Sequence, residues 1–183
     1  MLPWIMNARG SGCFGERNTE MSKVCYFASD AKLGGKENPY VHLFSIREAL
    51  AFGVNLDMNL LEGINPDEPG VIAWCENEDM FAYPNIWISK PFLQAPKSEK
   101  KYYAEMGGNP LLDLPGIIAY IHENLQKKKN GENTKELELW YVWLPCDEED
   151  IIEKTCSLKD LTEDVLREVF ADDDVDYKLT IVR

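Results

Sequence analysis

The sequence predicts an α+β protein, with a mixed sheet of about five strands and three principal helices. Short β-branched and aromatic runs alternate along the chain with segments whose apolar residues recur at helical spacing. One run, Glu136–Leu144, is apolar on both faces, which is typical of a central strand covered on both sides. The 183 residues are 45% hydrophobic and 28% charged, enough to bury a core of this kind. We expect the order strand, helix, strand, strand, helix, strand, helix, strand, in a single domain over residues 21–183.

The predicted strands combine β-branched and aromatic residues between turn-forming residues. In chain order they are 24–28, 71–75, 86–88, 136–144 and 177–182. The polar link between the second and third of these strands favours a hairpin. Residues 90–110 contain three prolines and a Gly-Gly pair, so we expect them to be irregular.

Each predicted helix carries signals at its ends. Ser45 and Glu48 form a capping box at the start of the helix 46–52, and Gly53 follows its last residue. The second helix begins near Pro115 and ends in three lysines, which suit the negative end of the helix dipole. The third begins near Thr162, with two acidic residues in its first turn.

Residues 1–20 follow neither a helical nor a strand period, and Met21 stands just before the first predicted strand. The string 15–17 can be encoded by a purine-rich segment that resembles a ribosome-binding site upstream of Met21. One interpretation is therefore that translation starts at Met21 and that 1–20 is an untranslated leader. The alternative is a genuine flexible arm, because chain termini are often of that kind.

The charge of the chain is unevenly distributed. There are 19 basic and 32 acidic residues, a net charge of −13. From residue 136 to the C-terminus there are 15 acidic and 5 basic residues, so −10 of this charge lies in the last 48 residues. An acidic surface repels phosphate backbones and anionic lipids, so the sequence predicts no nucleic-acid binding and no membrane docking. It favours a basic protein partner, with solubility as the alternative explanation.

Two acidic runs provide the candidate binding residues. They are Asp147, Glu148, Glu149 and Asp150, and then Asp172, Asp173 and Asp174. The second run begins like a calcium loop, but the positions that need glycine and glutamate hold Tyr177 and Arg183. Hard cations need ligands that converge from several segments, so we expect no metal and no cofactor. Both runs are interpreted as surface for a basic partner or as solvated loops.

The five cysteines are widely spaced, and no Cys-x-x-Cys pair occurs. Zinc sites usually contain paired ligands a few residues apart. Cys25 and Cys75 lie inside apolar strand-like runs, where cysteine behaves as a small hydrophobic residue. The sequence therefore predicts reduced thiols without a disulfide, and a cytoplasmic protein.

A catalytic site is the alternative to a binding surface. The residue types of a Ser-His-Asp site occur at Ser29, Asp30, His42 and Ser45, but neither serine lies in a Gly-x-Ser-x-Gly motif. A site could also be assembled from loop residues: Asp30, His42, Lys101, Tyr102 or Tyr103, and the carboxylates 147–150. The glycine pairs at 34–35 and 107–108 match neither glycine motif for nucleotides.

Four tryptophans lie on predicted strands: Trp74, Trp87, Trp140 and Trp143. If several share one exposed face they form a recognition surface, because tryptophan is enriched at binding hot spots; if they face helices they belong to the core. With the acidic C-terminal region, this pattern favours a non-catalytic protein-binding module of the inhibitor or immunity type. The alternative is a small enzyme of unknown reaction with a scattered site.

Overall fold

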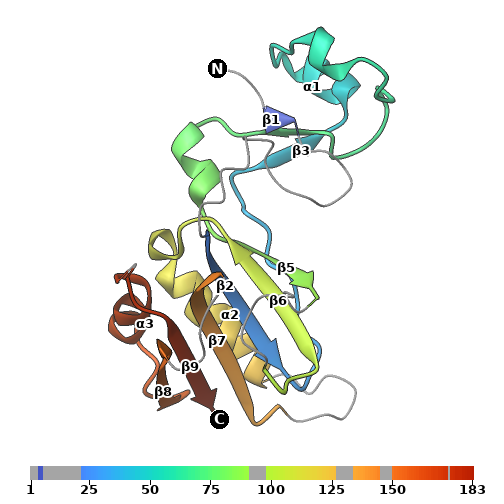
Figure 1. Cartoon of the computed structure of the whole chain (residues 1–183). Coiled ribbons are helices and arrows are strands. Elements are labelled where there is room, and N and C mark those ends of the chain that lie inside the picture. Colours follow the sequence, from blue (N-terminus) through green and yellow to red (C-terminus); the bar gives the residue numbers. More distant parts are fainter. Residues whose placement is uncertain (1–3, 6–21, 91–97, 127–133, 145–149, 173) are drawn as a thin grey trace. The chain divides into compact units, whose positions relative to one another are not determined.

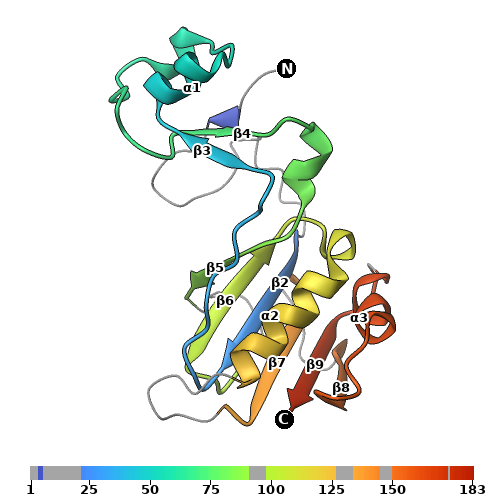
Figure 2. The same ribbon diagram turned by 180° about the vertical axis from the view of Figure 1, so that it is seen from behind.

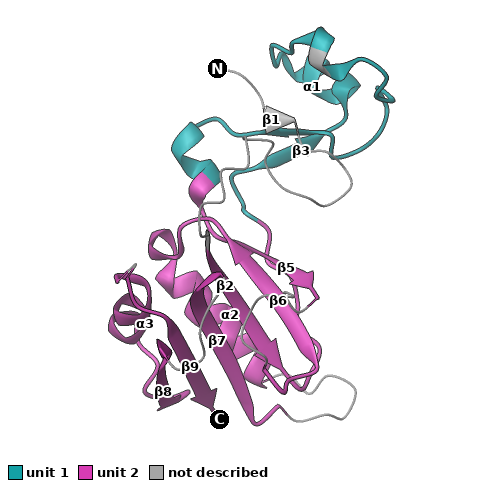
Figure 3. Cartoon of the chain, viewed as in Figure 1, with its two compact units in different colours: residues 1–18, 38–81 teal, residues 19–37, 82–183 magenta. Residues whose placement is uncertain are grey.

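The computed structural model describes residues 4–5, 22–90, 98–126, 134–144, 150–172 and 174–183. The chain forms two compact units, which Figure 3 shows in teal and magenta. The first unit comprises residues 1–18 and 38–81, and the second comprises residues 19–37 and 82–183. The helices and strands of the chain, with a mixed sheet among them, confirm the predicted α+β class.

The second unit is built on a mixed six-stranded sheet (Figure 1). In spatial order its strands are β5 (Asn85–Ser89), β6 (Tyr102–Gly107), β2 (Ser22–Ser29), β7 (Glu136–Leu144), β9 (Tyr177–Val182) and β8 (Ile152–Ser157). Neighbouring strands are antiparallel except β8 and β9, which are parallel. A parallel pair needs a crossover connection, and helix α3 (Glu163–Phe170) lies within it.

Strand β7 lies inside the sheet, as its two apolar faces predict. It pairs with β2 on one side and with β9 on the other. Leu137 and Leu139 belong to the core beneath the helices, whereas Trp140 and Val142 point to the opposite face. All four side chains are buried, so neither face of this strand is left to solvent.

Helices α2 (Leu114–Gln126) and α3 cover the same face of the sheet, which is turned toward the viewer in Figure 2. Both lie where the sequence predicts helices. Leu166, Val169 and Phe170 of α3 join the α2 residues and the sheet in one core cluster. None of the helices in the described ranges is long and apolar enough to cross a membrane.

The first unit contains a small sheet in the order β1 (Trp4–Ile5), β4 (Ile72–Trp74) and β3 (His42–Phe44). Helix α1 (Ile46–Phe52) packs against it around a separate core. The predicted capping box is present: Ser45 Oγ accepts from the Glu48 N–H, and Glu48 Oε2 accepts from the Ser45 N–H at 2.8 Å. Gly53 ends the helix at a φ of 91°, a conformation that favours glycine.

Two expectations about the strands are wrong. Residues 71–75 and 86–88 do not form a hairpin, because β4 pairs with β1 and β3 whereas β5 pairs with β6. Residues 90–110 are not irregular throughout, because β6 lies among them. The prolines around β6 conceal it in the sequence, since they indicate loops more strongly than its mixed residues indicate a strand.

Part of the N-terminal stretch is also paired. Trp4 and Ile5 lie opposite Ala73 and Ile72 in an antiparallel pair. Residues 6–21 lie outside the described residues. A translation start at Met21 therefore stays a prediction.

A partly buried ion pair fixes the start of α2. Lys36 Nζ lies 2.5 Å from Asp113 Oδ2, and the Gly116 N–H donates to Asp113 Oδ1 at 3.0 Å. Burial opposes ionisation of Asp113, but hydrogen bonds from Lys36, Tyr83 and Gly116 outweigh it and lower the pKa of the carboxyl. A Cβ at Gly116 would lie 1.9 Å from Asp113 Oδ2 and 2.2 Å from Lys36 Nζ. The glycine therefore leaves the space that this pair needs.

We expect Gly116→Ala to destabilise the protein by about 2 kcal/mol, because the added methyl group displaces the ion pair. The sign is diagnostic, since Gly→Ala inside a helix ordinarily stabilises by roughly 0.5–1 kcal/mol. Urea unfolding of the two proteins measures the change. The control is the same substitution in an Asp113→Ala background, where no carboxylate meets the methyl group and the cost should shrink; an equal cost in both backgrounds contradicts this role of the pair.

Candidate functional site

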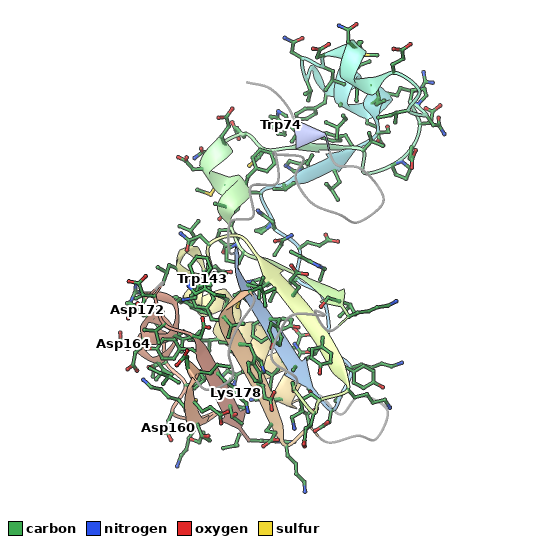
Figure 4. The ribbon with its side chains drawn as sticks, viewed as in Figure 1. Trp74, Trp143, Asp160, Asp164, Asp172 and Lys178 are labelled. Atoms are coloured by element: carbon green, nitrogen blue, oxygen red, sulfur yellow. The ribbon has the colours of Figure 1, made fainter. Side chains whose placement is uncertain are left out.

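Among the acidic residues that the sequence selects, Asp172 and Asp174 lie in the turn that follows helix α3. Asp150, Asp172 and Asp174 are exposed, whereas Asp147, Glu148, Glu149 and Asp173 lie outside the described residues. In Figure 4, Asp160, Asp164 and Asp172 lie on the same side of the second unit, over α3 and the turns at its ends. We call the exposed carboxylates Asp160, Glu163, Asp164, Asp172 and Asp174 the α3 side.

The negative charge of the α3 side is only partly compensated. Ser157 Oγ donates to Asp160 at 2.5 Å. Within the described ranges, Glu163, Asp164 and Asp174 form no ion pair. The first two lie in the first turn of α3, where the helix dipole stabilises negative charge. This surface therefore presents uncompensated carboxylates to solvent.

Lys23 holds the acidic turn that follows α3. Its Nζ donates to the carbonyls of Asp172 at 2.9 Å and Val175 at 2.8 Å, and lies 4.3 Å from the ring centroid of Tyr141. Within the turn, the Asp174 N–H donates to Asp172 Oδ1 at 3.0 Å. These are the contacts of a helix-to-strand turn. Among the residues that the structure describes, no group of three or more His, Cys, Asp and Glu could hold a metal ion.

The candidate catalytic residues are only partly brought together. Asp30 follows β2, and its Oδ2 lies 2.9 Å from Lys100 Nζ, just before β6. The same end of β6 carries Lys101, Tyr102 and Tyr103. His42, in contrast, belongs to β3 in the first unit, where its ring stacks on Phe44.

The serines and cysteines of the sequence hypotheses have structural contacts. Ser29 Oγ accepts from the Ala31 N–H at 3.2 Å, and Ser45 caps α1. Burial, and then the charge of Glu105, raises the pKa of the Cys25 thiol, which disfavours the reactive thiolate. The described cysteines, Cys25, Cys75 and Cys156, are free thiols.

A second surface, which sequence reasoning missed, is the face of the six-stranded sheet opposite α2 and α3. We call it the open face, and Figure 1 shows it with α2 behind the sheet. The strand registers place one row of side chains across all six strands. From β5 to β8 the row consists of Trp87, Glu105, Tyr26, Trp140, Lys178 and Glu153.

The row is closely packed at its centre. The rings of Tyr26 and Trp140 stack with an interplanar angle of 7° and centroids 5.7 Å apart, and both residues are buried. Lys178 Nζ lies 5.0 Å from the Trp140 ring centroid and 3.3 Å from Glu153 Oε1. At the β5 edge, Trp87 is 40% exposed. The row is therefore accessible at its β5 end.

A buried carboxylate lies beside this row. Glu138 of β7 is 8% exposed, and its Oε2 accepts from Ser98 Oγ at 2.6 Å and from Trp140 Nε1 at 2.9 Å. The Tyr103 hydroxyl donates to the Ser98 carbonyl at 2.8 Å. These bonds hold Ser98 against the open face, between Glu138 and Tyr103.

Lys100 strengthens this attachment. Its Nζ lies 2.9 Å from Asp30 Oδ2 and 2.5 Å from Glu136 Oε1. Burial disfavours the ammonium form, but hydrogen bonds to the two carboxylates outweigh burial and raise the pKa of Lys100. The side chain stays charged near neutral pH and acts as a fixed clamp rather than as a general base.

The four tryptophans of the strands have three different surroundings. Trp87 and Trp140 share the open face. Trp143 lies near the end of β7, where its backbone N–H donates to Asp176 Oδ1 at 2.8 Å, and Trp74 belongs to the first unit (Figure 4). Alternation within β7 indicates that Trp140 and the leucines face opposite ways. It does not reveal which side chains of other strands lie beside Trp140.

Comparisons with known proteins add no relative. No protein-family model matches the chain, and neither the curated proteins nor the solved structures gave a significant match.

We expect Lys23→Met to destabilise the protein by about 1–3 kcal/mol, because two carbonyls lose a charged donor while the aliphatic stem is largely kept. Hydrogen exchange of residues 171–176 should accelerate, and the urea midpoint should fall. The matched control is Lys32→Met, which removes the same charge at an exposed position. Equal midpoints for the two variants would show that Lys23 does not hold the turn.

Proposed function

We propose that the chain is a non-catalytic protein-binding module, of the inhibitor or immunity type, that binds a basic protein through its α3 side. The observation that carries this proposal is the set of exposed carboxylates Glu163, Asp164 and Asp174, which have no ion-pair partner among the described residues. Uncompensated surface charge of one sign accelerates encounter with a partner of the opposite sign.

The setting that we propose is the cytoplasm. The thiols of Cys25, Cys75 and Cys156 are free, which agrees with a reducing compartment. The acidic surface also argues against nucleic acid as the partner, because phosphate groups would be repelled.

The second candidate function is a small enzyme, and one contact favours it. Ser98 Oγ donates to the buried carboxylate of Glu138 at 2.6 Å, and its oxygen also accepts from the Lys100 N–H at 3.1 Å. A hydroxyl beside a carboxylate base is one element of nucleophilic catalysis. Covalent labelling of Ser98 by a fluorophosphonate probe, lost in Ser98→Ala, would favour this alternative over the binding module.

The binding proposal is tested with a variant that neutralises four of the five carboxylates of the α3 side: Glu163→Gln, Asp164→Asn, Asp172→Asn and Asp174→Asn. The basic partner is first isolated by affinity purification, with the tagged chain as bait and an extract of the organism that produces it. Surface-plasmon kinetics should then show an association rate about tenfold lower for the variant at low salt, with a smaller change in dissociation. The difference should shrink at high salt, because screening weakens attraction between charges.

The matched control changes net charge by the same amount in the first unit. It carries Glu62→Gln, Glu76→Gln, Glu78→Gln and Asp79→Asn, all at exposed positions. If both variants slow association equally, the net charge matters and the α3 side does not. Association that is indifferent to salt and to both variants would contradict the proposal.

A further inference from the structure

One end of the row on the open face already holds a cation. Lys178 Nζ lies over the ring of Trp140, 5.0 Å from its centroid, and 3.3 Å from Glu153 Oε1. An aromatic ring and a carboxylate on the two strands that flank β9 thus hold one ammonium group between them. The ring attracts the cation through its negative face, and the carboxylate attracts it by charge.

The other end has the same two groups. Trp87 of β5 and Glu105 of β6 are direct cross-strand partners, and their side chains are hydrogen-bonded. No ion pair joins Glu105 to a lysine or arginine within the part of the chain that is described. This end therefore has a ring and a carboxylate but no cation.

The Trp87 ring is positioned for contact from outside. A Cβ built at Gly107 would lie 2.7 and 2.8 Å from two atoms of this ring, so the ring occupies the space that a side chain at Gly107 would take. The residue is nevertheless 40% exposed. The absence of a side chain at Gly107 thus makes room for the ring, and part of the ring surface is open to solvent.

A cation beside Glu105 would stabilise the charged form of its carboxylate. The carboxylate is partly buried between β5 and β2, and burial raises its pKa, although the hydrogen bond from Trp87 acts in the opposite direction. A partly desolvated carboxylate without a cation is costly to keep charged. An incoming cation removes part of that cost, and this gain is available only at the end of the row that lacks one.

We propose that Trp87 and Glu105 form a receptor for an arginine side chain of the basic partner, held as Lys178 is held by Trp140 and Glu153. The proposal rests on the proposed function, since it assumes that a basic protein is bound. Arginine fits better than lysine, because its flat guanidinium stacks on a ring while two of its N–H groups donate to a carboxylate.

The test uses the full chain labelled with ¹⁵N and follows the indole N–H signal of Trp87, which is assigned from the Trp87→Phe spectrum. The probe is a short synthetic glycine–arginine peptide, and the comparison peptide carries glutamine at each arginine position. We expect the Trp87 signal to shift saturably with the arginine peptide and to stay in place with the glutamine peptide.

Two isosteric variants complete the experiment. Glu105→Gln should weaken the response of the Trp87 signal about tenfold. Glu153→Gln is the matched control: it removes the same charge from the same sheet face, where a lysine is already bound, and should change the response less than about twofold. The two titrations of the wild-type protein are decisive even if a variant fails to fold.

The outcomes separate this inference from the proposed function. If the arginine peptide shifts signals of the α3 side but leaves Trp87 unmoved, the receptor is refuted and the basic-partner proposal stands. A response of equal strength in Glu105→Gln, or to the glutamine peptide, also refutes the receptor. If the arginine peptide moves no signal at all at low salt, both proposals fail.

Discussion

Strand β7 carries large apolar side chains on both faces, and the second unit is arranged so that both are buried. Leu137 and Leu139 lie against the core beneath α2 and α3. Each buried side chain of this size contributes about 1.5–3 kcal/mol, so a position at the sheet edge would be costly. Trp140 and Val142 on the opposite face have the same requirement, although both described helices of this unit are on the other side. A segment that is not part of the sheet must therefore lie against the open face, and Ser98 belongs to such a segment.

The carboxylate of Glu138 fixes the position of Ser98 on the open face. A buried carboxylate has to accept hydrogen bonds, because removing a charge from water without them costs on the order of several kcal/mol. Ser98 and the Trp140 indole donate to it, and Lys100, two residues after Ser98, forms ion pairs with Asp30 and Glu136. Residues 98–100 are thereby fixed to β7 and to the residue that follows β2, whereas Trp87 on β5 remains 40% exposed. The centre of the face is therefore closed, whereas its β5 edge is accessible.

Features that depend on neighbouring residues were predictable, and features that depend on register were not. The capping box at Ser45 and the interior position of β7 follow from local patterns, and the structure confirms both. The strand β8 has the polar sequence Ile-Glu-Lys-Thr-Cys-Ser and gives no apolar signal, because it lies at the edge of the sheet. The hairpin expected for 71–75 and 86–88 fails because β5 pairs with a strand that follows a proline-rich segment.

The candidate site shows the same division. The acidic character of the α3 side is visible in composition, because exposed charges do not need a partner to be recognised. The row from Trp87 to Glu153 exists only when five pairwise registers are known, since a slip of one residue in any strand would send its side chain to the other face. No single segment of the sequence contains that information.

The two charged surfaces belong to opposite faces of the sheet. Trp87 and Glu105 lie on the open face, whereas α3 packs against the other face together with α2. Attraction between exposed charges is screened over roughly 8 Å at physiological salt. The sheet and α3 itself separate the carboxylates of the α3 side from Glu105, so these carboxylates add little to the binding of a cation at Trp87 and Glu105. A basic partner that uses both surfaces has to reach around the sheet, with its charge steering the approach on one face and a single side chain bound on the other.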